Sequence, residues 1–96
     1  MEKEMLVIVD LKEGKFEKFM GWMQSDEGMG VRKSAAYPEK TIAAVKPDKS
    51  GIMFKVHVHN EEAMKQLVSG KHPVGKPIYD ECVNKMHAWE LTKVEA

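Results

Sequence analysis

The chain has 96 residues, a length that predicts one domain over residues 1–96. Its 15 basic and 15 acidic side chains balance, which argues against a nucleic-acid partner, and a hydrophobic content of 43% excludes a disordered chain. The single cysteine, Cys82, excludes an intrachain disulfide, and no apolar stretch approaches the roughly 20 residues of a membrane helix, so we expect a cytoplasmic protein without membrane contact.

The first predicted strand is the apolar run Met5–Val9. It is continuous and rich in β-branched residues, which is typical of a central strand buried on both faces. Apolar residues then recur at helical spacing over Phe16–Met23, which predicts a helix. We expect Gly28 and Gly30 to end this helix, because glycine adopts the left-handed conformation of a helix C-terminus without strain.

The segment Val31–Val45 is extended in character but interrupted by Pro38. Because proline donates no hydrogen bond to a sheet ladder, we predict one kinked strand at the edge of the sheet. Lys46–Gly51 has the composition of a turn. In the strand that follows, Ile52–His59, every second residue is a large apolar one, and this alternation predicts one buried face.

The C-terminal part begins with a helix that carries clear signals at both ends. Asn60 is a suitable N-cap for a helix over Glu61–Ser69, and Gly70 is suited to end it. Pro77 fits the first turn of a further short helix. The chain then returns to extended form over Met86–Lys93, which is the last predicted strand.

The predicted order is strand–helix–strand–strand–helix–strand, with a short extra helix before the last strand. This is the ferredoxin-like α+β order, an antiparallel sheet with both helices on one face. The uncovered face then carries Met53, Lys55, His57 and His59 beside apolar residues of the outer and central strands. Since large exposed apolar patches mark partner surfaces, we predict a homodimer that packs through this face.

At the level of pattern, the chain resembles the dimeric α+β barrel superfamily. The resemblance covers nearly the whole chain: Met5–Val9, Phe16–Met23, Ile52–His59, Glu61–Ser69 and the closing strand. It implies a barrel built by two ferredoxin-like chains. The superfamily contains cofactor-free antibiotic-biosynthesis-type monooxygenases, haem-degrading enzymes, muconolactone isomerase-like proteins and many small uncharacterised proteins, and this chain is most similar to the last group. No catalytic motif matches residue by residue, so none is carried over.

His57 and His59 lead the candidate ligand-binding residues. Residues i and i+2 of a strand project to the same side, roughly 6.6 Å apart. Two such imidazoles can share a metal, but zinc needs about four ligands and no third is identifiable, so we predict no metal site. A histidine can also act as a general base, and Lys55 on the same face can hold an anionic ligand. Trp89 completes the set as an aromatic wall between the sheet and a partner.

These features favour a homodimer that binds a small molecule in a cleft on the sheet face, and we expect no cofactor. Two alternatives stay open. One is a cofactor-free monooxygenase or isomerase that works in the same cleft, as the resemblance implies. The other is a protein-interaction module whose sheet face meets a different protein.

Overall fold

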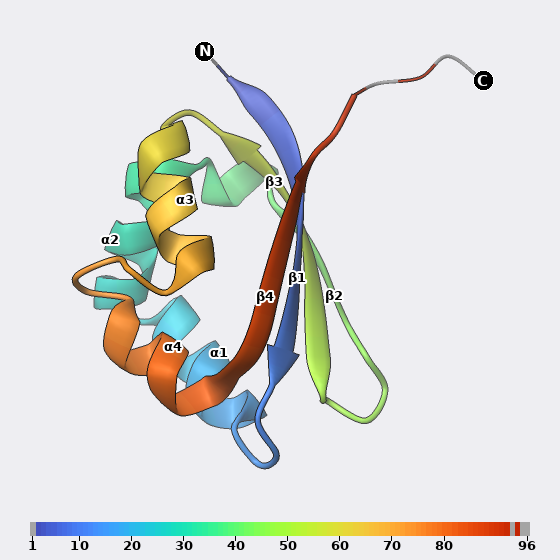
Figure 1. The fold of residues 1–96 in the computed structure, drawn as a ribbon, viewed down its shortest axis with the longest axis vertical. Coiled ribbons are helices and arrows are strands. Elements are labelled where there is room, and N and C mark those ends of the chain that lie inside the picture. The colour runs from blue at the N-terminus through green and yellow to red at the C-terminus, as the bar shows by residue number, and fades with distance from the viewer. Residues whose placement is uncertain (1, 93, 95–96) are drawn as a thin grey trace.

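The computed structural model describes residues 2–92 and 94. They form a four-stranded antiparallel sheet of order β2-β3-β1-β4, and the helices pack on one of its faces (Figure 1). The predicted ferredoxin-like α+β fold is therefore confirmed. In chain order the elements are β1 (Lys3–Leu11), α1 (Phe16–Gln24), α2 (Asp26–Ala35), the 3-10 helix η1 (Pro38–Lys40), β2 (Ile42–Val45), β3 (Gly51–Val58), α3 (Glu61–Ser69), α4 (Lys76–Cys82) and β4 (Val83–Glu90).

Strand β1 lies in the middle of the sheet, as its apolar sequence predicts. It pairs with β3 on one side and β4 on the other, so Val7 stands opposite both Phe54 and Ala88. Val7 is buried beneath the helices, whereas Leu6 and Ile8 point the other way and are only half-buried. Burial on both faces, expected from the sequence, is achieved within this chain on one face alone.

The core fills the space between the sheet and the helices. Every second residue of β3 points into it, in agreement with the predicted alternation. Burial raises the pKa of the Cys82 thiol, which is fully enclosed and packs as a core residue. The buried apolar cluster consists of Val7, Val9, Leu11, Phe19, Ala35, Ala36, Ile52, Phe54, Val56, Val58, Met64, Cys82 and Val83.

The prediction that Gly28 and Gly30 end the first helix is wrong. Helix α1 ends at Gln24, and both glycines lie inside α2. The Ser25 hydroxyl caps α2 by accepting a hydrogen bond from the Gly28 N–H at 3.1 Å, and two acidic residues follow in the first turn. This capped, acidic start stabilises a helix in spite of its two glycines.

Gly28 has a packing role instead. A Cβ atom at this position would lie 1.8 Å from the Trp22 carbonyl oxygen. Only glycine therefore allows α2 to begin so close to the end of α1. Gly30 differs, because a Cβ atom there would meet no other atom within 4 Å.

The prediction of one kinked strand over Val31–Val45 is wrong in its first part and right in its last. Residues 31–35 belong to α2, and Ala36 forms only an isolated bridge with Val58. Pro38 begins η1, where its fixed φ suits the first helical position. Strand β2 follows; it pairs with β3 alone and so lies at the edge of the sheet, as predicted.

Helix α3 agrees with the sequence prediction at both ends. It spans Glu61–Ser69, and the Asn60 side chain caps it by accepting a hydrogen bond from the Ala63 N–H at 3.1 Å. Gly70 ends it with a left-handed φ of 74°. Within the described residues, no helix is long and apolar enough to cross a membrane.

Helix α4 begins one residue before Pro77 and leads directly into β4. The strand starts earlier than predicted, at Val83, and ends at Glu90; Lys93, the predicted end, lies outside the described residues. Its two faces are as the alternation predicts. Met86 and Ala88 pack against the core, while His87 and Trp89 are exposed on the opposite side.

Candidate functional site

The face of the sheet that the helices leave bare is the first candidate site. We call it the open face, and alternation along β3 separates it from the core: Met53 is 44% exposed, whereas Phe54 is 6% exposed. The structure places Lys55 and His57 on it, where the sequence predicted them. The open face consists of Glu4, Leu6, Ile8, Ile42, Ala44, Met53, Lys55, His57, His87 and Trp89.

Large apolar side chains are exposed across the open face. Antiparallel pairing brings residues of all four strands into cross-strand rows. One row contains Ala44, Met53, Ile8 and His87, and the next contains Ile42, Lys55, Leu6 and Trp89. Ile42 is 65% exposed and Trp89 49% exposed. The open face is therefore an apolar surface that carries a few charged groups.

Lys55 is one of these charged groups. Its Nζ lies 2.9 Å from Oε2 of Glu4. A shallow pocket of about 90 Å³ lies beside it and is lined by Glu4, Lys40, Ile42, Lys55, Val56 and His57. Trp89 stands on the far side of Leu6 and stacks on His87, with ring centroids 5.8 Å apart, so it does not line this pocket.

His57 forms a carboxylate–imidazole pair at one end of the open face. Its Nε2 lies 2.7 Å from Oε1 of Glu2, and the Tyr37 hydroxyl donates a 3.4 Å hydrogen bond to Oε2 of the same carboxylate. The hydrogen bond from His57 lowers the pKa of Glu2, and the negative charge of Glu2 raises the pKa of Tyr37. When Nε2–H is donated to the ionised carboxylate, Nδ1 of a neutral His57 is left as the basic atom.

His59 follows the end of β3 and has a different partner. Its Nε2 lies 2.7 Å from the Lys33 carbonyl oxygen, and since a carbonyl only accepts, Nε2 carries the proton. The Tyr37 ring contacts both imidazoles, at centroid distances of 5.6 Å to His57 and 4.8 Å to His59. The two histidines are thus held apart by different acceptors. In the part of the chain that is described, no group of three or more His, Cys, Asp or Glu side chains is placed to hold a metal ion.

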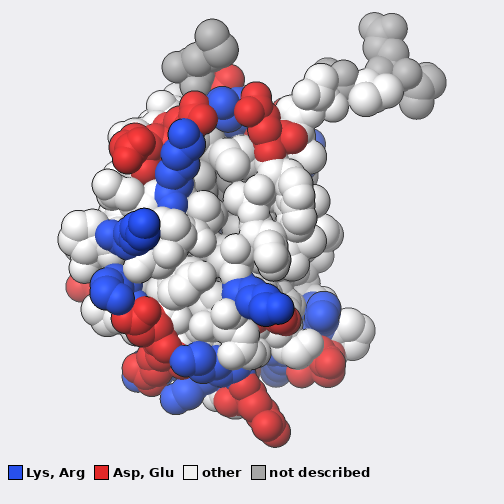
Figure 2. Space-filling model, in the orientation of Figure 1, with Lys and Arg blue, Asp and Glu red and all other residues white. Residues whose placement is uncertain are grey.

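A second candidate site, which the sequence did not reveal, lies between the helices and the covered face of the sheet. We call it the interlayer pocket; its volume is about 100 Å³. Its wall is almost entirely apolar and includes Val7, Phe54 and Val56 from the sheet and Phe19, Leu67 and Ile78 from the helices. Figure 2 shows an uncharged area over the region where α3 faces β4, two elements that contribute lining residues.

Arg32 is the one charged side chain in the wall of the interlayer pocket. Its Nη1 donates a 3.2 Å hydrogen bond to the Met23 carbonyl oxygen and lies 3.1 Å from the Met29 sulfur. Burial lowers the pKa of the guanidinium. Trp22 also lines the pocket, with its indole N–H directed to a Glu27 carboxylate oxygen 2.8 Å away.

The interlayer pocket was missed because α2 was not recognised as a helix. In a helix, Arg32 follows Gly28 by one turn and shares its buried side. A charged residue on the buried face of a helix is the signal that would have drawn attention to this place. Because Val31–Val45 was predicted to be a strand, Arg32 was not placed on the face of a helix, and this signal was lost.

Comparisons with known proteins identify the fold. No protein-family model matches the sequence, and no curated protein matches it. Among solved structures, the chain is similar to a NIPSNAP family protein of Agrobacterium tumefaciens, with a TM-score of 0.67 and 10% identity over 99% of this chain and 95% of that one. It is also similar to an uncharacterised NIPSNAP domain protein of Burkholderia xenovorans, with a TM-score of 0.65 and 15% identity over 98% and 95% of the two chains.

A third similar structure is a candidate antibiotic biosynthesis monooxygenase of Bacteroides thetaiotaomicron. It aligns with a TM-score of 0.61 and 13% identity over 98% of this chain and 90% of that one. At these identities the likeness concerns the fold. The resemblance to the dimeric α+β barrel superfamily that was drawn from the sequence is confirmed at that level.

Proposed function

We propose that the protein is a homodimer whose protomers each bind a small, largely apolar molecule in the interlayer pocket. The observation that carries the ligand proposal is the pocket itself. Ligand sites are concave, mostly apolar and equipped with few polar groups, and the interlayer pocket has this composition. Cytoplasmic residence is part of the proposal, because the single cysteine, Cys82, is a free and buried thiol.

The ligand proposal can be tested with isobutyramide as a small uncharged probe whose binding is followed by amide chemical shifts. We expect shifts at pocket residues such as Phe54 and Leu67 and none at the exposed Glu13. Val68→Phe, which fills the pocket from α3, should abolish them. The matched control is Val74→Phe, at an exposed position outside the pocket wall, which should leave them unchanged. Shifts that persist in Val68→Phe would contradict the pocket as the site.

The homodimer proposal rests on the open face. Ile42, Met53 and Trp89 expose large apolar surface there, and a second copy of the same face would cover it. Light scattering at micromolar protein should give twice the chain mass of 10.9 kDa. A mass of one chain across that range would refute the dimer. Co-purification of a different protein on this face, with no self-association, would support the interaction module instead.

A second candidate function is proton transfer on the open face, as in a cofactor-free monooxygenase or an isomerase. It is favoured by the Glu2–His57 pair beside the shallow pocket that Lys55 lines. His57 would act as the base through Nδ1, and Lys55 would hold an anionic substrate. Within a homodimer, Trp89 would belong to the same enclosed surface, whereas His59, which lies beyond β3 and contacts the Lys33 carbonyl of α2, would not.

This second candidate can be tested with a panel of C–H-acidic lactones and quinols. We expect His57→Ala to abolish turnover without loss of fold. His59→Ala should retain it, because His59 is engaged with the Lys33 carbonyl. Equal loss in both variants, or no turnover of any panel member by the wild type, would count against a base at His57.

A further inference from the structure

We propose that the interlayer pocket selects carboxylic acids with a short aliphatic tail, and that Arg32 pairs with the carboxylate. The inference rests on the proposed ligand function of the pocket and adds the chemical class of the ligand. It follows from the surroundings of Arg32, from the charge that the pocket carries and from the size of the pocket.

The hydrogen-bond partners of Arg32 are neutral. Nη1 reaches the Met23 carbonyl oxygen and the Met29 sulfur, and in the described residues no carboxylate forms an ion pair with the guanidinium. Several lysines, for example Lys3, Lys18 and Lys55, pair with a glutamate, and the described lysines without an ion pair, such as Lys33 and Lys85, are exposed. Arg32, the only arginine of the chain, differs because it is a partly buried cation without an ion pair among the described residues.

A guanidinium in this setting favours an anion. Arg32 is partly buried, so it loses hydration, and burial lowers its pKa because the charged form is penalised. An anionic group beside it would offset that penalty. Arginine is suited to carboxylates because its planar fork donates two parallel hydrogen bonds, and two bonds from Nη1 leave the other N–H groups available.

The charge and the size of the pocket narrow the ligand class. One positive side chain in an apolar wall matches a single negative charge, whereas a phosphate dianion would bring a second, uncompensated charge into the pocket. The volume of about 100 Å³ is smaller than the engineered cavity of roughly 150 Å³ that accepts benzene. Since an aromatic acid is larger than benzene, the acid should have a short aliphatic chain, with its carboxylate held at Arg32.

The test compares isobutyrate with isobutyramide, its uncharged counterpart, by titration calorimetry and amide chemical shifts at neutral pH. We expect isobutyrate to bind more tightly than isobutyramide. Arg32→Gln should weaken isobutyrate about 10- to 100-fold, as loss of charge-assisted hydrogen bonds does, and leave isobutyramide unchanged. Lys33→Gln is the matched control, since it removes an exposed positive charge from the next position of the same helix. It should change neither affinity.

Arg32→Lys provides a second variant if Arg32→Gln fails to fold. It retains the charge but loses the planar fork, so isobutyrate affinity should fall between those of the wild type and the glutamine variant. Equal binding of isobutyrate and isobutyramide by the wild type would overturn the assignment of Arg32 and leave the apolar-ligand proposal standing. Absence of binding by both probes would overturn the two proposals together.

Discussion

The two faces of the sheet are made from alternate residues of the same strands, yet they are covered differently. On the covered face, Val7 and Phe54 are 5% and 6% exposed beneath the helices. On the open face, Met53 and Trp89 are 44% and 49% exposed. The helices of the described residues lie on the opposite side of the sheet (Figure 1). This difference separates residues that fill the core from residues that the proposed dimer would cover.

The largest expected effect on the free energy of unfolding comes from truncating a core residue of β3. Two neighbouring residues of this strand, which point to opposite faces, are compared. Phe54→Ala should lower the free energy of unfolding by about 3–5 kcal/mol, because it leaves a cavity in the core. Met53→Ala should lower it by about 1 kcal/mol or less in dilute protein, because its side chain is half exposed. Urea denaturation at low protein concentration measures both. Equal losses would show that the open face is already packed within one chain.

The packing of the helices over the sheet depends on one glycine of α2. Gly28→Ala should lower the free energy of unfolding by about 3 kcal/mol, because the new Cβ atom would clash with the Trp22 carbonyl oxygen and push α2 from α1. Gly30→Ala is the matched change in open space and should stabilise the protein by roughly 0.5–1 kcal/mol. Thermal melts of the two variants measure both effects. Similar melting temperatures would contradict the close approach of α1 and α2.

The same glycine explains where sequence reasoning succeeded and failed for the fold. For α3, the local signals agree: Asn60 caps the helix, Gly70 ends it, and apolar residues recur between them. For α2, glycine was taken as a local stop, although Gly28 is required by contact with another helix. Local sequence cannot distinguish a glycine that ends a helix from one that admits a neighbour. The signals that end a helix lie in neighbouring residues, whereas the need for glycine at a contact between helices is set by the tertiary structure.

The candidate sites likewise contain features that the sequence predicted and features that it did not. The period of two along β3 was sufficient to place Lys55 and His57 on the open face. The partner of His57, Glu2, lies far away in sequence and is brought near by the pairing of β1 with β3. The interlayer pocket depends on how α2 packs over the sheet, and the four-residue spacing of Gly28 and Arg32 points to it only once α2 is recognised as a helix.

A smaller effect is expected from Trp89 on the open face. If a second chain covers this face, Trp89→Ala should weaken the dimer about 30-fold, which corresponds to about 2 kcal/mol for an aromatic anchor residue. Val45→Ala is the control: Val45 is 42% exposed but lies on the other side of the sheet, opposite Ile52. Sedimentation over a dilution series measures both dissociation constants. Equal weakening would place the interface elsewhere.

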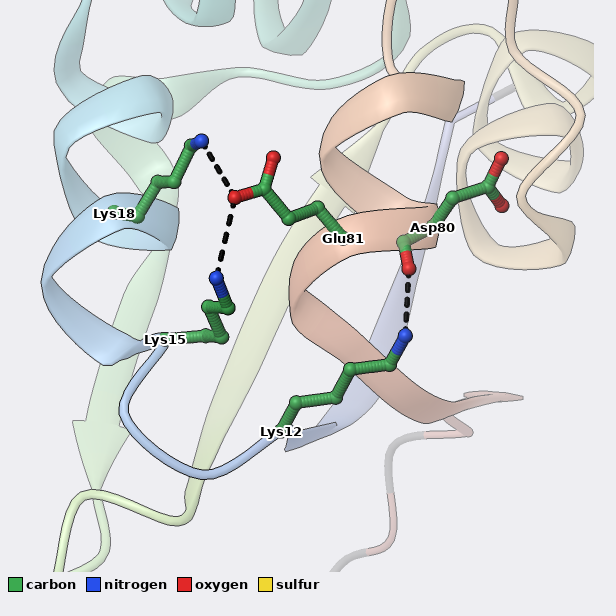
Figure 3. Close-up of polar contacts among 5 residues, drawn as sticks. All are labelled: Lys12, Lys15, Lys18, Asp80 and Glu81. Atoms are coloured by element: carbon green, nitrogen blue, oxygen red, sulfur yellow. Dashed lines mark hydrogen bonds and ion pairs between the residues drawn. The ribbon is translucent and has the colours of Figure 1, made fainter.

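The smallest effect concerns the charged rim of the covered side, where α4 is joined to α1. Figure 3 shows Glu81 of α4 between two lysines: Oε2 lies 2.5 Å from Nζ of Lys18 and 3.3 Å from Nζ of Lys15. In the same view Lys12 donates a 2.7 Å hydrogen bond to the Asp80 carbonyl oxygen. These contacts fix the end of the helical layer from outside the core.

The hydrogen bonds from Lys18 and Lys15 lower the pKa of Glu81 below its usual value of 4.5. A carboxyl group whose pKa is lower in the folded chain stabilises it above the unfolded value, and this contribution disappears as pH falls through the folded value. Glu81→Gln should therefore destabilise slightly at pH 7, and the difference from the wild type should shrink as pH falls below about 4.5 and vanish once pH lies below the lowered folded value. Because all three side chains are largely exposed, salt should reduce the effect.

Glu13→Gln is the matched control. It removes an exposed carboxylate that makes no ion pair among the described residues, so it should leave the free energy of unfolding at pH 7 unchanged in denaturant titrations. A Glu81→Gln difference that is undiminished at pH 3 would mean that the Glu81 side chain stabilises the protein through packing. The contact between α4 and α1 would then depend on shape and not on charge.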